Sequence, residues 1–430
     1  MPEAILPRDD SIIRTPGSPS HTRRASLKIL SRNIDKVVLG NLLFDTWYFS
    51  PYPESIIFNS DHHSSKALSN GDQRNGQHEK SVSPVVAKLH VCPYCFRYGT
   101  SPADYISHLQ VHVKEIEDAP ENWWPVPKTA LKVYEWDGYT VWDVDGEQEK
   151  LYCQNLSLFA KLFLEQKSVF FDTAGFHYFV LTYSPANDPS SPKAAKGRGR
   201  RRTSSSTNRD LGLKTQVMGF FSKENLSWDA NNLACILVFP PYQHRNLGQL
   251  LMAVSYKLSG WEWEDSIIGG PEKPLSTLGR RSYLRFWSER IARFSMGQTT
   301  DAEGRKVFSK ISKKRTTFAK EEMTIKEVGD RTGMLPEDVI AALNEMGVCE
   351  IVPRKRKAKP DDHHNPEPAE EALPTTMLIK RSQILAWAKK NKVDLVAPVK
   401  EEGFLGEWAL SDSDSGESVD ASSIEEGAES

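Results

Sequence analysis

The sequence lacks any apolar run that approaches the roughly eighteen residues a membrane-spanning helix needs. Its first residues, MPEAILPRDD, lack the apolar stretch of a secretory signal peptide, so we expect a soluble, intracellular protein. Cysteine is also scarce, with five in 430 residues, and only Cys92 and Cys95 lie close together. An odd number of scattered cysteines argues against a disulfide framework and favours a reducing compartment, with metal binding as the use of the close pair.

Charge is nearly balanced in sum but unevenly distributed. The formal net charge is −2, yet the final thirty residues contain ten acidic residues and no Lys or Arg. Basic runs lie at 198–202, 313–315 and 354–357. Such blocks are usually solvated tails or loops; the alternative is nuclear import or contact with nucleic acid.

Composition and length together divide the chain. A chain of 430 residues predicts two or three folded units with tails, and segments rich in Ser, Pro, Asn or charge mark the boundaries. The predicted organisation is a disordered N-terminus (1–30), a folded central part (31–297), a helix-turn-helix or winged module (316–355), a linker (356–376), a short ordered segment (377–408) and an acidic disordered tail (409–430). Within the central part we expect a metal-binding finger at about 88–115, disorder over 59–85 and an inserted loop over 185–213.

The periodicity of apolar residues gives the order of elements in the central part. Aromatic and β-branched runs at 176–183, 217–221 and 233–239 predict strands. Helical spacing follows at 247–258 and again at 284–294. Strands followed by helices in this order predict an α/β or α+β core.

A second helical region follows the central part. Residues 323–352 predict two short helices separated at Gly333, a helix end at Gly347 and a strand from Val348. This order is typical of a small helix-turn-helix or winged module.

The most specific short motif is a set of two cysteines and two histidines. Cys92 and Cys95 are followed after twelve residues by His108, and His112 lies one helical turn further on. This spacing predicts a tetrahedral Zn²⁺ site whose ligands come from a turn and from one helix face. Zinc binding contributes on the order of 10 kcal/mol to folding of such a small unit. A single finger reads only about three base pairs, so a structural role is favoured over sequence-specific DNA binding.

A candidate phosphate-binding turn precedes the helix at 247–258. The sequence LACILVFPPYQHRNLGQLL, which starts at Leu233, places a strand, a double-proline break and a polar turn with Gly248 directly before an apolar helix. Backbone N–H groups at a helix start have no intrahelical partner and carry the positive end of the helix dipole, so they bind pyrophosphate well. A polar turn before a helix is common in proteins. The residues on either side of this turn are what make it a candidate site.

Two reactive side chains flank this turn. Cys235 lies on the preceding strand, and Glu272 lies in the proline-bounded loop 271–274. A lysine substrate has an ordinary pKa of about 10.4, so a positioned carboxylate must remove its proton before the nitrogen can attack a thioester. Glu272 is a candidate base; the alternative is a carboxylate favoured by the dipole of the next helix. A thiol on an apolar strand is a poor nucleophile unless a neighbouring group activates it.

Short sequence words spread over about 151–293 match a known enzyme family. They are YCQNL at 152–156, AKLFL at 160–164, GFFSKE at 219–224, ACIL at 234–237, PPYQ at 240–243, GPEKPLS at 270–276 and SY at 282–283. In these words the segment resembles the catalytic domain of the MYST family of histone acetyltransferases. The resemblance implies an α/β (α+β) fold: an acetyltransferase mixed-sheet core with an N-terminal zinc finger and a C-terminal helix-turn-helix or winged module.

The resemblance also implies roles for individual residues. Glu272 corresponds to the general base. Cys235 corresponds to a cysteine with two alternative roles, either formation of a covalent acetyl intermediate or packing and positioning. We favour direct transfer to the substrate, without the covalent intermediate. Lys167 corresponds to a lysine that the enzyme acetylates on itself. The alternative is that Lys167 is only an exposed lysine at the end of a helix. The residues implied to contact acetyl-CoA are Ile236, Val238, Gln243, His244, Arg245, Asn246, Leu247, Gly248, Gln249 and Ser276.

The chain departs from the family pattern in the cofactor turn and in the finger. Asn246 stands where the family usually has glycine, His244 where it has arginine, and Gln249 where it has lysine. Asn tolerates left-handed backbone geometry, so the turn is expected to survive while two positive charges near the phosphates are lost. His112 stands where the family commonly has cysteine and still completes a tetrahedral site.

These observations predict a nuclear histone lysine acetyltransferase that uses acetyl-CoA, has structural Zn²⁺, acts on histone tails or nucleosomes and works with subunits of a chromatin-modifying complex. Histone H4 is the expected substrate, because the short N-terminus resembles the something-about-silencing branch. Glu262, Glu264 and Asp265 are expected to attract a basic tail. The alternatives are a catalytically weakened chromatin-binding scaffold subunit and a sequence-specific DNA-binding regulator.

Overall fold

The computed structural model describes residues 32–58, 86–118, 123–185, 215–260, 267–296, 322–353, 375–394 and 396–409. The segments predicted to be disordered tails, inserted loop or linker lie almost wholly outside these residues, as do the three basic runs and the acidic residues Glu262, Glu264 and Asp265. Within the described part of the chain, no helix is long and apolar enough to cross a membrane.

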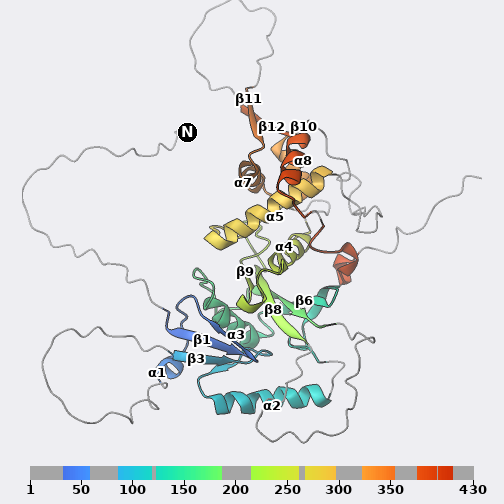
Figure 1. The fold of residues 1–430 in the computed structure, drawn as a ribbon. Helices are drawn as coiled ribbons and strands as arrows, with labels where there is room; N and C mark the ends of the chain where they lie inside the picture. Colours follow the sequence, from blue (N-terminus) through green and yellow to red (C-terminus); the bar gives the residue numbers. More distant parts are fainter. Residues whose placement is uncertain are drawn as a thin grey trace, which may run out of the picture. The chain divides into compact units, whose positions relative to one another are not determined.

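A five-stranded antiparallel sheet forms the centre of the protein, in the order β5-β6-β7-β8-β9 (Figure 1). Its strands are β5 (Leu131–Trp136), β6 (Tyr139–Asp145), β7 (Phe176–Tyr183), β8 (Gln216–Glu224) and β9 (Cys235–Val238). Five consecutive residues of β7 and six of β8 are buried. Such continuous burial requires cover on both faces of the sheet, and this explains their unbroken runs of aromatic and β-branched residues.

Three helices surround the central sheet, two of them in contact with its strands and the third packed on one of these two. These are α3 (Lys150–Lys161), α4 (Leu247–Lys257) and α5 (Thr277–Met296). Nearly every side chain of α4 is buried, because α4 lies between the strands β8 and β9 and the helix α5. The Trp287 indole N–H of α5 donates to the Tyr256 hydroxyl of α4 at 2.7 Å, and the Ser157 hydroxyl of α3 lies 3.0 Å from that of Tyr178 in β7. These buried hydrogen bonds fix the helices against each other and against the sheet.

The N-terminal residues form a second, four-stranded sheet in the order β2-β1-β3-β4. Its elements are β1 (Ile34–Leu39), β2 (Leu42–Asp45), α1 (Glu54–Phe58), β3 (Val86–Val91), β4 (Tyr98–Gly99) and α2 (Pro102–Asp118). β1 pairs in parallel with β3, and the other two pairs are antiparallel. Phe44 and Trp47 pack on Phe163, just after α3, at ring distances of 5.7 and 5.5 Å, so this sheet is attached to the central part by aromatic contacts.

The C-terminal residues form a small winged module. It consists of β10 (Glu322–Met323), α6 (Ile325–Thr332), α7 (Pro336–Met346), β11 (Cys349–Pro353), β12 (Thr375–Lys380) and α8 (Arg381–Lys390). Thr324 and Glu327 form a reciprocal capping box at the start of α6. Gly333 and Gly347 end α6 and α7 in the left-handed conformation, at φ 66° and 67°, so the helix breaks predicted at these glycines are confirmed.

The last described residues connect the winged module with the central sheet. β12 pairs with both β10 and β11, so the segment predicted as a separate ordered piece at 377–408 begins inside the sheet of the winged module. The chain then returns to the central sheet, where Leu405 N–H donates to Val133 O at 3.1 Å and Phe404 packs on Tyr134. Glu401 pairs with the largely buried Lys257 of α4 at 2.7 Å.

The predicted strands at 176–183, 217–221 and 233–239 and the predicted helices at 247–258 and 284–294 are confirmed by β7, β8, β9, α4 and α5. The α+β class is confirmed as well. The central sheet itself is antiparallel, and parallel pairing occurs in the N-terminal sheet and at one bridge beside β9.

Gly219 is expected to be essential for the pairing of β8 with β9. A Cβ at this position would lie 2.5 Å from the Leu237 carbonyl oxygen, closer than real side chains allow. We therefore expect Gly219→Ala to lower the free energy of unfolding by about 1–3 kcal/mol, as an overpacked core does. Gly175→Ala is the matched control, because a Cβ there meets nothing within 4 Å. Denaturant titration of both variants measures the difference; equal stability would contradict this account of the strand pair.

Candidate active site and metal centre

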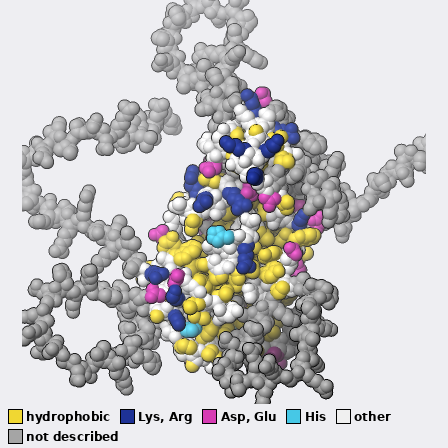
Figure 2. All heavy atoms as spheres, viewed as in Figure 1, with side chains coloured by type: hydrophobic (Ala, Val, Ile, Leu, Met, Phe, Trp, Pro, Cys, Tyr) yellow, Lys and Arg dark blue, Asp and Glu magenta, His cyan; other side chains and the backbone are white. Residues whose placement is uncertain are grey.

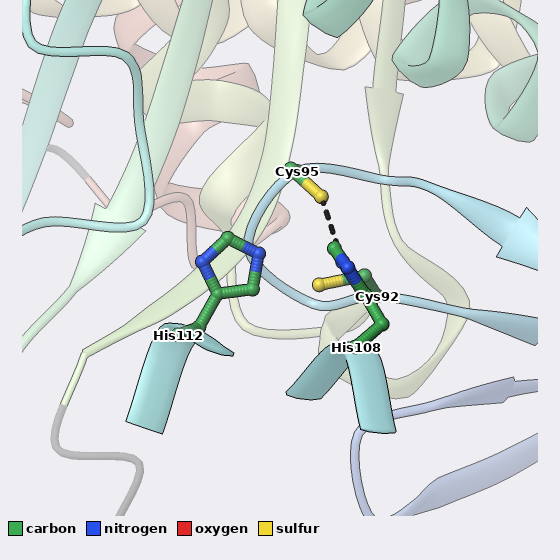
Figure 3. Close-up of side chains that lie close together, drawn as sticks. All are labelled: Cys92, Cys95, His108 and His112. Atoms are coloured by element: carbon green, nitrogen blue, oxygen red, sulfur yellow. Dashed lines mark hydrogen bonds between the residues drawn. The ribbon is translucent and has the colours of Figure 1, made fainter. Parts of the chain in front are cut away.

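The predicted metal ligands meet beside the N-terminal sheet. Cys92 and Cys95 lie on the turn that follows β3, and His108 and His112 lie one turn apart on α2. Their ligand atoms all lie within 4.8 Å of one another (Figure 3). Cys95 Sγ is 3.2 Å from His108 Nε2. The structure therefore brings together the four residues that the spacing singled out, and their binding of zinc in a tetrahedral arrangement stays a prediction.

The environment of these four residues fits a zinc ion. The His112 Nε2 atom is buried without a hydrogen-bond partner, while its Nδ1 lies 3.0 Å from a Glu115 carboxylate oxygen. A carboxylate on the far ring nitrogen is the usual way in which a metal-binding histidine is oriented. A hydrogen bond from Cys92 lowers the pKa of the Cys95 thiol, which favours the thiolate form that binds metals. Two thiolates with two imidazoles form a donor set that selects zinc.

The zinc site has its own small hydrophobic cluster. Tyr94 packs edge-on against Trp123 and His112, with ring distances of 4.7 and 5.1 Å. Cys92, Tyr94 and Leu109 are the buried members of this cluster. So few buried side chains give the finger little core of its own, and this is why a metal contributes much of its folding free energy.

The loop that carries Glu272 is attached to the start of β9. Asn232 N–H donates to Gly270 O at 2.8 Å, and Glu272 N–H donates to Leu233 O at 2.9 Å. These bonds form a parallel bridge between Leu233 and Pro271. Helix α5 begins only at Thr277 and has no acidic residue in its first turn. Glu272 is therefore not a helix-start carboxylate, and that alternative is wrong.

Cys235 and Lys167 lie close together near this loop. Lys167 follows α3 and is half-buried, and its Nζ donates to Cys235 Sγ at 3.6 Å. The Cys235 sulfur also lies 3.0 Å from the hydroxyl of Ser222, its partner on β8. Lys167 is thus not a free lysine at the end of a helix. Its amine is held against the thiol that the sequence singled out.

The charges around Glu272 change its acidity. Partial burial raises the pKa of the Glu272 carboxyl above its ordinary value, and the Glu224 carboxylate raises it further. The Lys167 ammonium acts in the opposite direction. A carboxylate whose pKa is moved toward neutrality is a better proton acceptor at physiological pH, as general bases require.

The predicted phosphate-binding turn has the backbone geometry that the sequence suggested. Asn246 is left-handed at φ 59° and directly precedes Leu247, the first residue of α4. His244 is also left-handed, at φ 64°. Gln243 Nε2 donates to Val238 O at 2.9 Å, which holds the turn against the end of β9. Asn246 therefore adopts the conformation for which glycine is usual.

The residues implied to contact acetyl-CoA have different environments. His244, Arg245 and Asn246 are exposed on the turn, Ile236, Val238, Gln243 and Gly248 are half-buried, and Ser276 is exposed with its hydroxyl accepting from Gly279 N–H at 3.1 Å. Leu247 and Gln249 are buried. The Gln249 amide faces α5 and donates to Ser282 O at 3.3 Å, so this side chain does not extend toward the turn.

Arg285 is a residue at this turn that the sequence did not indicate. It lies on α5, and its guanidinium donates to Asn246 Oδ1 at 3.2 Å and pairs with Glu289 at 2.8 Å. It brings a positive charge to the turn from a different helix than the one that carries Gln249. The sequence pattern could not predict this contact, because thirty-nine positions separate Arg285 from Asn246.

Comparison with known families decides the relationship. The family model described as the MOZ/SAS family matches residues 127–192 and 206–371, more than half of the chain. The chain belongs to the MOZ/SAS family. A second model, the MYST family zinc finger domain, matches residues 31–62, which hold β1, β2 and α1. The resemblance to the MYST family is thereby confirmed.

Several relatives share this family. The chain is 31% identical over 313 residues to histone acetyltransferase MOF of Drosophila melanogaster, covering 73% of this chain and 27% of that protein. It is 33% identical over 260 residues to histone acetyltransferase SAS2 of Saccharomyces cerevisiae, covering 60% of this chain and 63% of that protein. For the histone acetyltransferase Tip60 homolog of Caenorhabditis elegans, the identity is 28%, covering 76% and 53%. The chain thus spans from about a quarter to less than two thirds of these relatives.

The fourth ligand gives the sharpest test of the metal centre. Because His112 Nε2 has no partner other than the cluster it faces, His112→Ala is expected to lose bound zinc and to destabilise the finger at 92–118 first. His112→Cys is expected to retain the metal, since three thiolates and one imidazole also bind zinc tetrahedrally. Metal analysis of both purified variants, with the unaltered protein at one zinc per chain, checks this. Full zinc content in His112→Ala would exclude this residue as a ligand.

Proposed function

We propose that this protein is a histone lysine acetyltransferase that transfers an acetyl group from acetyl-CoA to a lysine side chain. The observation that carries the proposal is Glu272, a carboxyl with a raised pKa, held by backbone hydrogen bonds to the residues that lead into β9, the strand that runs on to the turn before α4. Membership of the MOZ/SAS family supports the same reaction. In this assignment acetyl-CoA supplies an acyl thioester, and the residues of the chain bind it and move the proton.

Glu272 performs the proton transfer in the proposed reaction. The carboxylate removes one proton from the substrate ammonium, and the freed amine forms a bond to the thioester carbonyl carbon. The carbon–sulfur bond then breaks, CoA leaves as a thiolate, and the thiolate takes up the second proton, which the nitrogen loses as the amide forms. Glu272 is exposed enough to meet an incoming lysine, and its partial burial keeps its pKa raised.

Cys235 serves the proposed reaction by position and not as a nucleophile. Its sulfur is half-buried between the Lys167 amine and the Ser222 hydroxyl. Direct transfer in a ternary complex needs no bond to this sulfur. An acetyl thioester on Cys235 after incubation with acetyl-CoA, detected by mass spectrometry, would contradict direct transfer.

Self-acetylation of Lys167 belongs to the same proposal. Its amine lies 3.6 Å from the Cys235 sulfur and acts electrostatically on Glu272. An amine placed between Cys235 and the proposed base supports the proposal that Lys167 itself receives an acetyl group. Acetylation removes its positive charge and, with it, the effect that lowers the pKa of Glu272.

The turn from Gln243 to Gln249 is the proposed site for the phosphates of acetyl-CoA. The first N–H groups of α4 lack intrahelical partners and carry the positive end of the helix dipole. Arg245 and Arg285 place positive charge on the same turn, and Asn246 keeps its backbone left-handed. These features favour a functional enzyme over a scaffold with a decayed cofactor turn. Ile236, Val238 and Ser276 are the remaining proposed contacts.

Histone tails are the proposed substrates, with H4 as the preferred one, and the nucleus is the proposed location. Partners are proposed to be subunits of a chromatin-modifying complex. Hydrophobic side chains gather over the middle of one face of the protein, with Lys and Arg side chains among and above them (Figure 2). A surface on which apolar side chains gather favours association with other proteins.

Replacement of the proposed base is the direct test of the reaction. We expect Glu272→Gln to lower kcat by about 10²- to 10⁴-fold, the usual contribution of a general base. The measurement is transfer from labelled acetyl-CoA to core histones, with H4 resolved from the others. Glu345→Gln, on the exposed face of α7, is the control and should transfer normally. Equal transfer by Glu272→Gln and the unaltered protein would leave the enzyme without this base.

The pH profile tests the charges around Glu272. The base acts only when ionised, so kcat/KM is expected to fall as the pH drops through the raised pKa of Glu272. Because Glu224 contributes to that raised pKa, Glu224→Gln is expected to move the acid limb of the profile to lower pH. The test is to measure kcat/KM across the acid range for Glu224→Gln and for the unaltered protein. An unchanged or upward-shifted limb would argue against electrostatic coupling of Glu224 to Glu272.

A further inference from the structure

The loop 269–274 is held on a second side, by the winged module. Lys273 directly follows Glu272, and its Nζ lies 2.8 Å from Asp338 Oδ1 and 3.3 Å from Glu337 Oε1. Both carboxylates belong to the first turn of α7. The central sheet therefore holds this loop through backbone atoms, and the winged module holds it through an ion pair.

The contact is close as well as charged. A Cβ on Gly270 would lie 2.8 Å from Asp338 Oδ2 and 2.8 Å from Leu335 Cδ1. A Cβ there would have to displace the ends of these two side chains, so side chains from the start of α7 pack directly on the backbone of the loop. Glycine at position 270 makes that approach possible.

The two carboxylates that face Lys273 differ in burial. The Asp338 side chain is 2% exposed, whereas that of Glu337 is 59% exposed. Burial raises the pKa of Asp338, and the Lys273 ammonium opposes that change. The second oxygen of Asp338 has no hydrogen-bond partner. A buried pair of this kind adds little net stability, but loss of one partner leaves the other uncompensated.

The winged module is itself fixed to α5, the helix that packs on α4. Arg290 on α5 donates to Thr332 O at the end of α6 at 2.6 Å, and Arg381 at the start of α8 donates to Ser295 O at 2.5 Å. Val339 and Leu343 of α7 are fully buried. Asp338 therefore approaches the loop from a rigid support.

We propose that Asp338 is a positioning residue for the general base, acting through Lys273 to fix the loop that carries Glu272. The winged module is then a part of the active site and not only an appended domain. This inference rests on the proposed function, because it assigns Asp338 a role in the reaction of Glu272.

The test compares Asp338→Asn, Lys273→Met, the double variant, and Glu337→Gln as the exposed control. Displacement of a reacting group by about 1 Å costs up to roughly a hundredfold in rate, so Asp338→Asn and Lys273→Met should each lower kcat about ten- to a hundredfold. The KM for acetyl-CoA should change much less than kcat, because the turn 243–249 lies on other elements and Ser276 is the one proposed acetyl-CoA contact in the loosened segment. Since both partners act through one contact, the double variant should be no slower than the slower single variant. Glu337→Gln should change kcat by less than about twofold.

Two further measurements separate positioning from general stability. Hydrogen exchange of 267–276 should accelerate in Asp338→Asn and not in Glu337→Gln. The acid limb of the pH profile should move to lower pH in Asp338→Asn, because a loosened Glu272 is better solvated. Lys273 is 41% exposed, so Lys273→Met carries the test even where Asp338→Asn fails to fold.

Normal kcat with unchanged exchange in both single variants would overturn the proposal. Additive losses in the double variant, or a loss of activity that only follows the unfolded fraction, would also overturn it. If the unaltered protein transfers no acetyl group, the proposed function fails, and hydrogen exchange alone then decides whether Asp338 fixes this loop.

Discussion

Two backbone hydrogen bonds join residues 270–272 to residues 232–233 at the start of β9, and the candidate active site depends on them. They place a loop from after α4 beside a strand from before it. As a result Glu272, Cys235 and Lys167, which come from three separate stretches of chain, share one environment. The positions of these side chains are therefore set mainly by the backbone to which they are attached.

The parts of the protein are connected to this centre by different kinds of interaction. Aromatic packing on Phe163 attaches the N-terminal sheet, and the four metal ligands give the finger a stability that its few buried side chains lack. The winged module is attached by hydrogen bonds to α5 and by the pairing of Lys273 with Asp338. The last residues return to β5, where Phe404 packs on Tyr134. Each connection involves residues far apart in the chain.

At the candidate site, the raised pKa of Glu272 results from burial more than from any single charged neighbour. Glu272 is partly buried beside a second carboxylate, Glu224, and both effects raise its pKa, while Lys167 opposes them. At the turn before α4, Arg285 supplies from α5 a positive charge that Gln249 does not, since the Gln249 amide is directed toward α5. The departures from the family pattern in this turn are thus accommodated by neighbouring elements.

The sequence by itself determined the local features. These are the strands at β7, β8 and β9, the helix ends at Gly333 and Gly347, the left-handed Asn246 and the spacing of the four metal ligands. All of them depend on periodicity, backbone preference or short spacing, which neighbouring residues set. Only the tertiary structure decided that β12 joins β10 and β11, that Arg285 reaches Asn246, and that Asp338 contacts Lys273. These contacts join residues from 22 to 65 positions apart, and their pairing depends on how whole elements pack, which no local pattern encodes.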